Sequence, residues 1–447
     1  MKIIIAGAGL TGSSIVSYLS QNYNSDDIVV IDTNPCALQK LSASYDVQTI
    51  CGSSSNPEIL KQAGTKDADI IMALTDSDEV NMVTCQMAYS LFNIQKKIAR
   101  VEETDLLAPL WKDLYNEQNM PIDYIVSTNL ELANNVFSLI KIPQARDFAC
   151  IRDGRFNLLS FKIEDTTPIV NAQILELERL FNGINISVLL IIRNGCVVIP
   201  TEEETFLSGD EVFFITSENA QDIAIEAFGK ASQSNERVLI FGANNVCELL
   251  LKQLQKDSVI TNIKVIEENI AKAQDLSFRY NDVQVISGSL LSDAILSEAG
   301  INKADITVSL TNEDKDNILT SILSHSLNVN SNISLLNSKI YDNMLDGLDN
   351  NISIDRSTII SSSILKAVKN LDFVHVLSKN YGEVWGLKMQ KRADYKKIAK
   401  LKGVKIGLVI RDEEYLYELP LNGLQRKDYV ILFVENSIIQ KAEELFV

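Results

Sequence analysis

Residues 1–12 read MKIIIAGAGLTG, and this stretch decides the fold of the N-terminal part. Gly7, Gly9 and Gly12 form a G-x-G-x-x-G pattern between an apolar run and a helical pattern. Asp32 lies at the end of the next apolar run. In this context the first glycine makes a tight turn, the second brings bare backbone to a pyrophosphate, and the third lets helix and strand pack closely. The stretch therefore predicts a Rossmann-like sheet with a dinucleotide site.

The same arrangement recurs in the second half of the chain. Residues 237–247 read RVLIFGANNVC, which places Gly242 on Gly7 and Glu267 on Asp32. With one inserted residue, the match continues from CGSSSNPEILKQAGTKDADIIMALTDSDEVNM to SGSLLSDAILSEAGINKADITVSLTNEDKDNI. Weaker matches follow each copy, at 147–161 with 372–386 and at 207–216 with 425–434. The chain is therefore an A–B–A′–B′ repeat.

Alternating strand and helix patterns in A and A′ give the fold class. We predict two tandem Rossmann-like, doubly wound parallel sheets, each followed by a small α+β domain. A helix is expected within the first small domain at 171–180, and the polar segment 230–236 is expected to link the halves. The expected divisions are 1–126 (Rossmann-like), 127–143 (bridging helix), 144–229 (small domain), 236–356 (Rossmann-like), 357–370 (bridging helix) and 371–447 (small domain).

Further residues are expected at the first nucleotide cleft. Gly52–Ser53 and Thr75–Asp76 follow the third and fourth strands, at the sheet edge where ligands bind in such folds. Arg100 ends the fifth strand, where it could meet a phosphate, and a surface ion pair explains it equally well. The carboxylate of Asp32 accepts ribose hydroxyls and repels a 2′-phosphate, which favours NAD(H) over NADP(H).

The second glycine turn is altered. Asn244 and Cys247 replace its second and third glycines. Asn tolerates positive φ, which would let the turn survive. Its side chain would crowd a pyrophosphate, and Cys247 would widen the packing of helix on strand, whereas Glu267 keeps the acidic ribose partner. Weaker binding, binding of a mononucleotide and no binding all remain open for this copy.

Charge and composition exclude several function classes. The net charge of −18, from 41 Lys and Arg against 59 Asp and Glu, disfavours binding to nucleic acid or to anionic lipid through a basic patch. The six cysteines form no CxxC pair, so neither zinc nor a disulfide framework is indicated. The longest apolar runs are strand-sized and no signal peptide is recognisable, so a cytoplasmic protein is expected.

An NAD-dependent oxidoreductase is the alternative function. Hydride chemistry usually needs an acid or base beside the nicotinamide, and the two histidines, His325 and His375, lie outside A and are read as structural. Asp76, Asp78 and Glu79 could hold a cation, but acids that favour a helix N-terminus explain them better. We expect no catalytic residues and no metal site. A nucleotide-binding module with another kind of partner is a third possibility.

Several stretches closely resemble the TrkA family, the peripheral regulatory subunits of bacterial Trk potassium-uptake systems. They are MKIIIAGAGLTG, DADIIMALTDSDEVNMVTCQMAYSLFN followed by KKIARV, and LSGDEVFFIT, and the likeness extends over essentially the whole chain. The resemblance implies tandem RCK modules and no enzymatic activity. It also implies binding of NAD(H), or of ATP or ADP as in some relatives. It further implies a ring, expected to be a homotetramer, on the inner face of the membrane against a potassium-translocating subunit.

The resemblance also assigns nucleotide contacts by position. Together with the cleft residues derived above, the predicted cofactor-binding residues of the first copy are Gly7, Ala8, Gly9, Leu10, Thr11, Gly12, Asp32, Gly52, Ser53, Thr75, Asp76 and Arg100. Those of the second copy are Gly242, Ala243, Asn244, Asn245, Val246 and Glu267. A further departure between the repeats, Lys427 where the first small domain has Gly209, is interpreted as turn chemistry.

Overall fold

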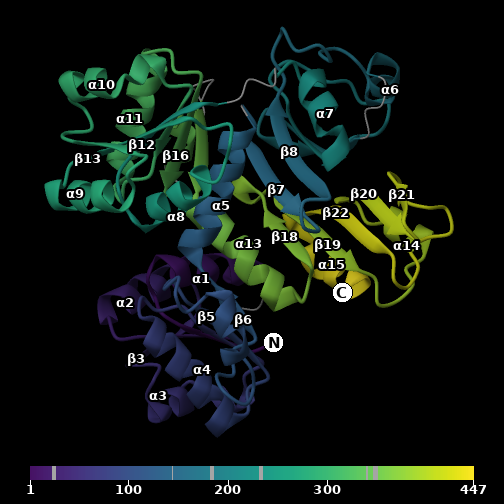
Figure 1. Cartoon of the computed structure of the whole chain (residues 1–447). Coiled ribbons are helices and arrows are strands. Elements are labelled where there is room, and N and C mark those ends of the chain that lie inside the picture. Colours follow the sequence, from purple (N-terminus) through teal and green to yellow (C-terminus); the bar gives the residue numbers. More distant parts are fainter. Residues whose placement is uncertain (23–26, 143, 182–185, 231–234, 339–340, 346–350) are drawn as a thin grey trace.

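Four β-sheets organise the chain, two of them parallel and two antiparallel (Figure 1). The structure, a computed structural model, describes residues 1–22, 27–142, 144–181, 186–230, 235–338, 341–345 and 351–447. Within these ranges, no helix combines the length and the apolar character that crossing a bilayer demands. Most of the expected linker at 230–236 lies outside the described residues.

The first parallel sheet is centred on the strand that precedes the glycine turn. Its order is β3-β2-β1-β4-β5-β6, and all four residues of β1 are buried because helices cover both faces. The last strand, β6, was not predicted. The strands are β1 (Ile3–Ala6), β2 (Ile28–Asp32), β3 (Gln48–Cys51), β4 (Ile70–Ala73), β5 (Lys96–Arg100) and β6 (Tyr124–Val126), and the helices are α1 (Leu10–Asn22), α2 (Pro35–Ser44), α3 (Pro57–Gln62) and α4 (Asp78–Phe92).

The second parallel sheet repeats this topology, as the sequence repeat predicts. Its order is β14-β13-β12-β15-β16-β17, with β12 in the place of β1. The strands are β12 (Arg237–Phe241), β13 (Asn262–Glu267), β14 (Gln284–Ser287), β15 (Ile306–Ser309), β16 (Ser331–Leu336) and β17 (Asn351–Asp355). The helices are α8 (Asn245–Leu254), α9 (Ile270–Arg279), α10 (Asp293–Ala299), α11 (Asp314–Ser326) and α12 (Asp342–Leu345).

The two antiparallel sheets pack face to face through one apolar cluster. They approach closely at Gly407, where an added Cβ would lie 2.4 Å from Leu189 Cδ2 and 2.8 Å from Ile215 Cδ1. The first sheet, β10-β9-β11-β8-β7, contains β7 (Asp147–Ile151), β8 (Phe156–Lys162), β9 (Ile186–Arg193), β10 (Cys196–Val198) and β11 (Glu211–Ser217), with α6 (Leu177–Leu180) and α7 (Gln221–Ala227). The second, β18-β19-β22-β20-β21, contains β18 (Phe373–Val376), β19 (Gly382–Lys388), β20 (Val404–Arg411), β21 (Glu414–Leu416) and β22 (Tyr429–Glu435), with α14 (Tyr395–Ala399) and α15 (Ile439–Phe446).

The helix expected at 171–180 is confirmed in part. A 3₁₀ turn at Ile174–Glu176 runs directly into the single turn α6, so helical backbone covers 174–180, and 171–173 lie outside it. The backbone N–H groups of Ile174 and Leu175 donate to the carbonyls of Glu204 and Glu202, both at 3.0 Å. These bonds satisfy the first N–H groups of the helical segment, which have no partner within a helix, and a β-bridge between Gln173 and Thr205 fixes where the segment begins.

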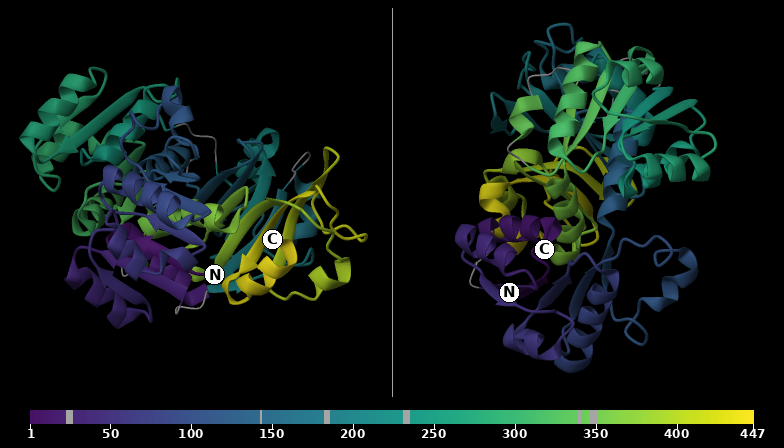
Figure 2. Two further views of the ribbon diagram at one scale, coloured as in Figure 1. Left: turned by 90° about the horizontal axis from the view of Figure 1, so that it is seen from below. Right: turned by 90° about the vertical axis from the view of Figure 1, so that its left-hand side faces the viewer.

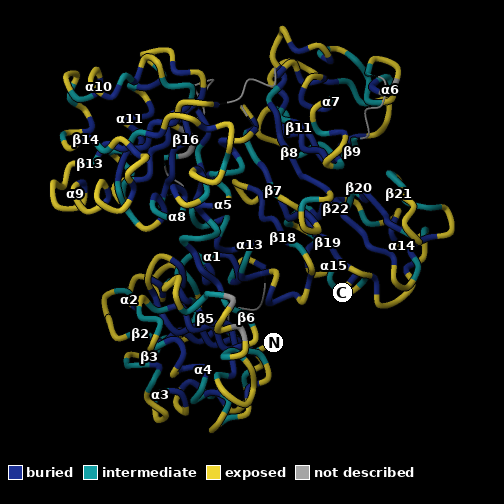
Figure 3. Tube along the Cα trace, in the orientation of Figure 1, coloured by how far each residue is buried: buried dark blue, intermediate teal, exposed yellow. Residues whose placement is uncertain are grey.

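Two long helices cross between the halves. Helix α5 (Thr128–Lys141) leaves the first parallel sheet and packs beside α8 of the second, while α13 (Arg356–Lys369) packs beside α1 of the first (Figures 1 and 2). Apolar residues of α5 share one core cluster with the first antiparallel sheet and the second parallel sheet. Residues of α13 share another with the first parallel sheet and the second antiparallel sheet. Most residues of both crossing helices are buried or intermediate (Figure 3).

The two crossings differ in chemistry. Beside α13, Lys369 Nζ lies 2.9 Å from Glu383 Oε1 and 3.0 Å from Glu443 Oε1, and both Lys369 and Glu383 are buried. Tyr18 and Trp385 also donate hydrogen bonds to Glu383. Burial raises the pKa of Glu383 and lowers the pKa of Lys369, so the two groups keep their charges only as a pair.

Candidate functional site

A cleft of about 400 Å³ opens at the carboxyl edge of the first parallel sheet. It lies where the loops after β1, β2, β3 and β4 meet, which is the expected ligand position in such a sheet. Eight of the twelve residues predicted for the first copy line it: Gly7, Ala8, Gly9, Asp32, Gly52, Ser53, Thr75 and Asp76. Of the other four, Leu10, Thr11 and Gly12 form the first turn of α1, and Arg100 ends β5 beside Asp76.

The three glycines of the first turn have different physical roles. Gly7 has a φ of +112°, and a Cβ there would lie 2.7 Å from the carbonyl oxygen of Leu74. A Cβ on Gly12 would lie 1.9 Å from the carbonyl oxygen of Gly7. A Cβ on Gly9, in contrast, would meet no atom within 4 Å. Gly7 and Gly12 thus shape the turn itself, whereas Gly9 leaves open space above the backbone.

Asp32 holds the loops on both sides of the cleft. Its Oδ2 accepts a hydrogen bond from the Ala8 N–H at 2.5 Å, and its Oδ1 accepts one from the Asn34 N–H at 2.7 Å. Asn34 in turn caps α2 by accepting from the N–H groups of Cys36 and Ala37, with Pro35 in the first turn. Each carboxylate oxygen has a second lone pair, so Asp32 can still accept from a ligand hydroxyl.

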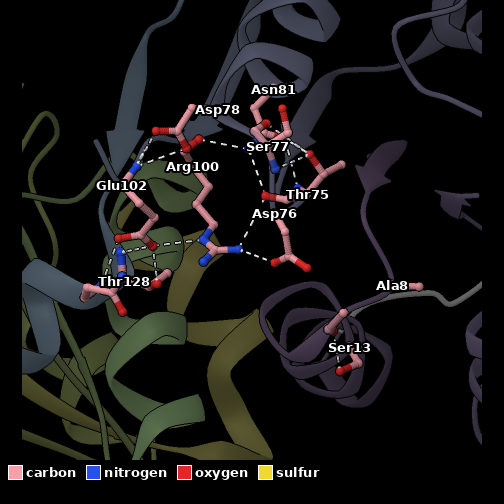
Figure 4. Close-up of polar contacts among 12 residues, drawn as sticks. Ala8, Ser13, Thr75, Asp76, Ser77, Asp78, Asn81, Arg100, Glu102 and Thr128 are labelled. Carbon is pink, nitrogen blue, oxygen red and sulfur yellow. Dashed lines mark hydrogen bonds and ion pairs between the residues drawn. The ribbon is translucent and has the colours of Figure 1, made fainter. Parts of the chain in front are cut away.

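The loop after β4 is held by a buried asparagine. Asn81 Oδ1 accepts from the Thr75 N–H at 2.9 Å, and its Nδ2 donates to the Arg100 carbonyl at 2.9 Å. Asp76 is 94 % exposed, and its carboxylate lies 2.8 Å from Arg100 Nη1 (Figure 4). Burial opposes the charge of Arg100, but hydrogen bonds and charges of Glu102 and Asp76 outweigh it and raise the pKa of Arg100. The arginine is therefore a permanent cation beside the cleft.

Glu102 is a residue that the sequence reasoning missed. Its Oε1 accepts from Arg100 Nε at 2.9 Å and from the Thr128 N–H at 3.0 Å, and its Oε2 accepts from the Asn129 N–H at 3.1 Å (Figure 4). The N-cap residue of α5, Ser127, makes no side-chain capping bond, so Glu102 caps the helix from a distance. In the sequence, the only sign of this role is an acidic residue shortly after a strand.

The acids after β4 also have structural partners. Ser77 caps α4 by accepting from the Val80 N–H, and Asp78 and Glu79 lie in the first helical turn. Asp78 accepts from the N–H groups of Glu102 and Glu103. Among the described residues, no group of three or more His, Cys, Asp or Glu side chains is placed to hold a metal ion. These contacts agree with acids that stabilise a helix N-terminus.

The second glycine turn keeps the shape of the first but fills its centre. Gly242 has a φ of +94°, and Glu267 accepts from the Ala243 N–H at 2.6 Å, as Asp32 does from Ala8. Asn244 Oδ1 accepts from the Cys247 N–H at 3.0 Å, and its Nδ2 donates to the Leu310 carbonyl. The side chain therefore occupies the space that is open above Gly9.

Two expectations about this turn need correction or restatement. Asn244 has a φ of −118°, so its tolerance of positive φ has no part in the turn, and the expectation that it does is wrong. Cys247 is fully buried and belongs to the core cluster of the second sheet.

Of the six residues predicted in this copy, Ala243, Asn244, Asn245 and Val246 line a cavity of about 300 Å³, which lies on the α9 side of the turn. Gly242 and Glu267 lie outside that lining.

The two histidines lie away from the first cleft. His375 is buried in β18, and its Nε2 lies 2.8 Å from the carboxylate of Asp147 in β7. This contact joins the two antiparallel sheets. His325 lies in the last turn of α11. Neither imidazole is placed where a nicotinamide in the first cleft could exchange a proton with it.

Comparison with known proteins agrees with this geometry. The TrkA-N domain family matches residues 3–128 and 238–354, and the TrkA-C domain family matches residues 158–229. The chain belongs to the TrkA family. It is similar to the protein named "Trk system potassium uptake protein TrkA" from Azorhizobium caulinodans, with 29% identity covering 100% of this chain and 98% of the relative. The protein of that name from Halomonas elongata is 31% identical, with the same coverage.

A solved structure supports the fold of this TrkA-family chain. The structure of the "GsuK channel bound to NAD" matches with a TM-score of 0.64 and 18% identity, over 99% of this chain and 78% of that one. At this identity the likeness establishes the fold alone, which is the tandem Rossmann-like and α+β arrangement described above. Membership of the TrkA family places the chain in potassium uptake.

Proposed function

We propose that this chain is a non-enzymatic, cytoplasmic regulatory subunit that senses a nucleotide and gates a membrane-embedded Trk-type potassium-translocating subunit. The proposed ligand of the first cleft is NAD or NADH, with ATP or ADP as the other candidates. The observation that carries the proposal is the open space above Gly9, next to the carboxylate of Asp32. The NAD bound to the GsuK channel, which shares this fold, supports a ligand of this class.

The geometry suggests a role for each part of the first cleft. Bare backbone at Gly9 lets a pyrophosphate approach the start of α1, where helical N–H groups favour anions. Asp32 offers its remaining lone pairs to ribose hydroxyls. Arg100 supplies a fixed positive charge beside the exposed Asp76. The proposed contacts are Gly7, Ala8, Gly9, Leu10, Thr11, Gly12, Asp32, Gly52, Ser53, Thr75, Asp76 and Arg100.

A route for regulation starts at Arg100. Its pair with Asp76 is solvent-exposed on one side and therefore weak, so an anion in the cleft can replace Asp76 as the partner. Arg100 is also bonded to Glu102, which caps α5. Because α5 crosses to the other half, a change at Arg100 reaches the packing between halves. A ligand acts in this way only if its affinity differs between two conformations of the assembly.

Calorimetric titration with NAD, NADH, ATP and ADP tests the site. We expect Gly9→Asn to weaken binding of the preferred nucleotide at least about tenfold, because a buried side chain replaces ligand-accessible backbone. Gly154→Asn is the control away from the cleft: a Cβ there also meets no atom within 4 Å, the residue lies in a turn of the first antiparallel sheet, and asparagine tolerates its φ of +87°. Equal affinity in wild type and Gly9→Asn would show that the glycine turn is not the binding surface.

The proposed partners are a multi-spanning potassium-translocating protein and three further copies of this chain in a ring. Co-purification with the membrane subunit and the mass of the purified assembly test these two points. An oxidoreductase would instead change nicotinamide absorbance with a small substrate. Potassium flux in vesicles that contain both proteins should respond to the nucleotide that binds. If that nucleotide leaves both flux and assembly unchanged, the regulatory proposal fails.

A further inference from the structure

The cavity of about 300 Å³ in the second half is not a copy of the first cleft. The first cleft lies between the glycine turn and Asp32, whereas this cavity lies between the second turn, α9 and the crossing helices. Glu267, the equivalent of Asp32, is bonded to the N–H groups of Ala243 and Asn269 and lies outside the lining. The walls come from α8, α9, the loop after β15, and the first turns of α5 and α13.

Positive charge in this cavity exceeds what its own acids neutralise. Arg279 bonds both lining acids, with Nη2 2.8 Å from Glu248 Oε1 and 2.6 Å from Asp275 Oδ2. Lys272 and Arg356 also line the cavity. Within the described part of the chain, no carboxylate forms an ion pair with either of these two cations.

Arg356 is the more unusual of the two cations. Its Nε is buried and has no hydrogen-bond partner among the described residues. A buried donor without a partner is costly, and most such groups in native proteins are satisfied by protein, water or a ligand. Burial and the nearby charge of Arg100 both lower the pKa of Arg356, and the charges of Glu102 and Asp314 offset this only in part. The charges around Arg356 therefore favour a further anion in the cavity.

The second glycine turn limits the size of a ligand here. Asn244 caps α8 with its own side chain and donates to the Leu310 carbonyl, so a pyrophosphate cannot approach the backbone as it can at Gly9. The remaining side chains around the cavity include the amides of Asn129, Asn245 and Asn312, which can donate to phosphate oxygens. This combination fits a phosphate group better than an extended dinucleotide.

We propose that this cavity binds a small phosphate-bearing anion, a diphosphate or a nucleoside diphosphate, with Arg356 and Lys272 as its charge partners. The guanidinium of Arg356 supplies planar donors for phosphate oxygens, and the ammonium of Lys272 closes the site from α9. Binding here does not depend on the proposed function of the first cleft.

The cavity also adjoins the capping network of the first half. Asn129, which lines it, donates its N–H to Glu102 at 3.1 Å, and Glu102 accepts from Arg100. An anion held by Arg356 offsets the repulsion between Arg356 and Arg100. Occupancy of the cavity is therefore coupled to the position of Arg100, and through it to the first cleft.

The test uses the full chain carrying Gly9→Asn, which should weaken binding at the first cleft. Pyrophosphate and ADP are titrated separately by calorimetry and by thermal unfolding at low salt. We expect at least one of them to bind with about one ligand per chain. Arg356→Met should weaken that binding at least tenfold. Lys272→Met should weaken it less, because Lys272 is exposed and its charge is screened.

The ligand-free stability of Arg356→Met separates binding from a structural role. Removing a buried cation without a partner should leave the unfolding temperature equal or higher, while the shift caused by the anion is lost. Lys252→Met, at the far end of α8, is the control and should bind as the parent does. Binding of pyrophosphate identifies the phosphate group as sufficient, and binding of ADP alone shows that the nucleoside is also needed.

Two results would overturn the proposal. One is that neither pyrophosphate nor ADP binds to the Gly9→Asn chain. The other is that binding survives in both Arg356→Met and Lys272→Met. Neither result bears on nucleotide binding at the first cleft, which is measured with the unmodified glycine turn.

Discussion

At the centre of the glycine turn the first half has Gly9 and the second half has Asn244. The two turns agree in their outer parts. Each opens with a glycine at positive φ, and the N–H of the residue after that glycine donates a hydrogen bond to an acid at the end of the next strand. They differ at the centre, where a ligand would touch, and at the third glycine position, where Cys247 replaces Gly12. Open space lies above Gly9, whereas the side chain of Asn244 bonds the Cys247 N–H and the Leu310 carbonyl. A turn can therefore keep its fold while a side chain fills the space above its central residue.

The two helix crossings show the same divergence in the packing. At the last residue of α13, Lys369 is 2 % exposed and lies between Glu383 and Glu443. At the last residue of α5, Lys141 is 39 % exposed and lies 2.6 Å from Asp257. Equivalent positions thus carry a buried charge network in one crossing and a surface ion pair in the other. Both contacts rest on apolar clusters, and the contact of the first half with the second antiparallel sheet adds a buried charge network to its cluster.

The largest expected effect comes from replacing the lysine at the end of each crossing helix, in a matched pair of variants. Lys369→Met leaves Glu383 buried without its cation, which should reduce the free energy of unfolding by about 3–5 kcal/mol. Lys141→Met removes a pair whose lysine is 39 % exposed, and it should cost less, about 1 kcal/mol. Urea unfolding of both variants, followed by the fluorescence of Trp385 and Trp111, measures the difference.

Similar losses in the two lysine variants would mean that the buried network does not hold the crossing. The hydrogen bonds from Tyr18 and Trp385 would then suffice to keep the Glu383 charge in place. A third variant, Tyr18→Phe, removes one of those donors without changing charge. It should cost less than Lys369→Met, because a hydrogen bond to a charged group contributes about 1.5–3 kcal/mol.

An effect of intermediate size is expected when Gly12 of the first turn is replaced by cysteine, the residue at the equivalent position of the second turn. Gly12→Cys places a Cβ 1.9 Å from the Gly7 carbonyl oxygen if nothing moves. Because the contact is with backbone, the turn must shift, and we expect a loss of about 2–3 kcal/mol in the free energy of unfolding. Nucleotide affinity should fall with it, measured by calorimetry.

The reverse substitution, Cys247→Gly, sharpens the same comparison. It removes one buried side chain from a turn that already accommodates it, and it should cost about 1–2 kcal/mol through a small cavity. If Gly12→Cys unfolds like wild type, the two turns are more alike than their sequences suggest, and the close approach at Gly12 is not needed.

The sequence predicts those parts of this comparison that depend on local pattern. The repeat implies two parallel sheets, and Gly7, Gly9, Asp32, Thr75 and Asp76 do converge on one cleft, because strand ends in such a sheet must meet there. The crossing of α5 and α13 is not predictable in this way. Each helix carries an apolar stripe that fits either half, and only long-range packing decides between them.

The same limit applies to single residues of the site. Glu102 caps α5 from another element, and Arg356 meets Arg100 only because α13 crosses over. No short motif contains either relation. The helix expected at 171–180 begins later than expected for a related reason, since Gln173 pairs in a β-bridge with Thr205, about thirty residues away.

The smallest expected effect concerns Glu131 on α5. The equivalent position of α13 is Ile359. Burial raises the pKa of Glu131. The charge of Lys366 and the hydroxyl of Ser363 lower it again, but only in part. The folded chain therefore binds this proton more tightly than the unfolded chain. Stability from this group is complete below the ordinary glutamate pKa of 4.5 and is lost as pH rises through the higher folded pKa.

Replacement by glutamine removes that dependence. Glu131→Gln should be more stable than wild type at pH 7 and closest to it near pH 4, measured as urea midpoints across that range. Ile359→Val is the control, because it changes packing at the equivalent position of α13 and should shift the midpoint by the same amount at each pH. A Glu131→Gln chain whose midpoint difference from wild type does not vary with pH would show that α5 carries its carboxylate in solvent. The asymmetry between the two crossings would then rest on Lys369 and Glu383 and not on Glu131.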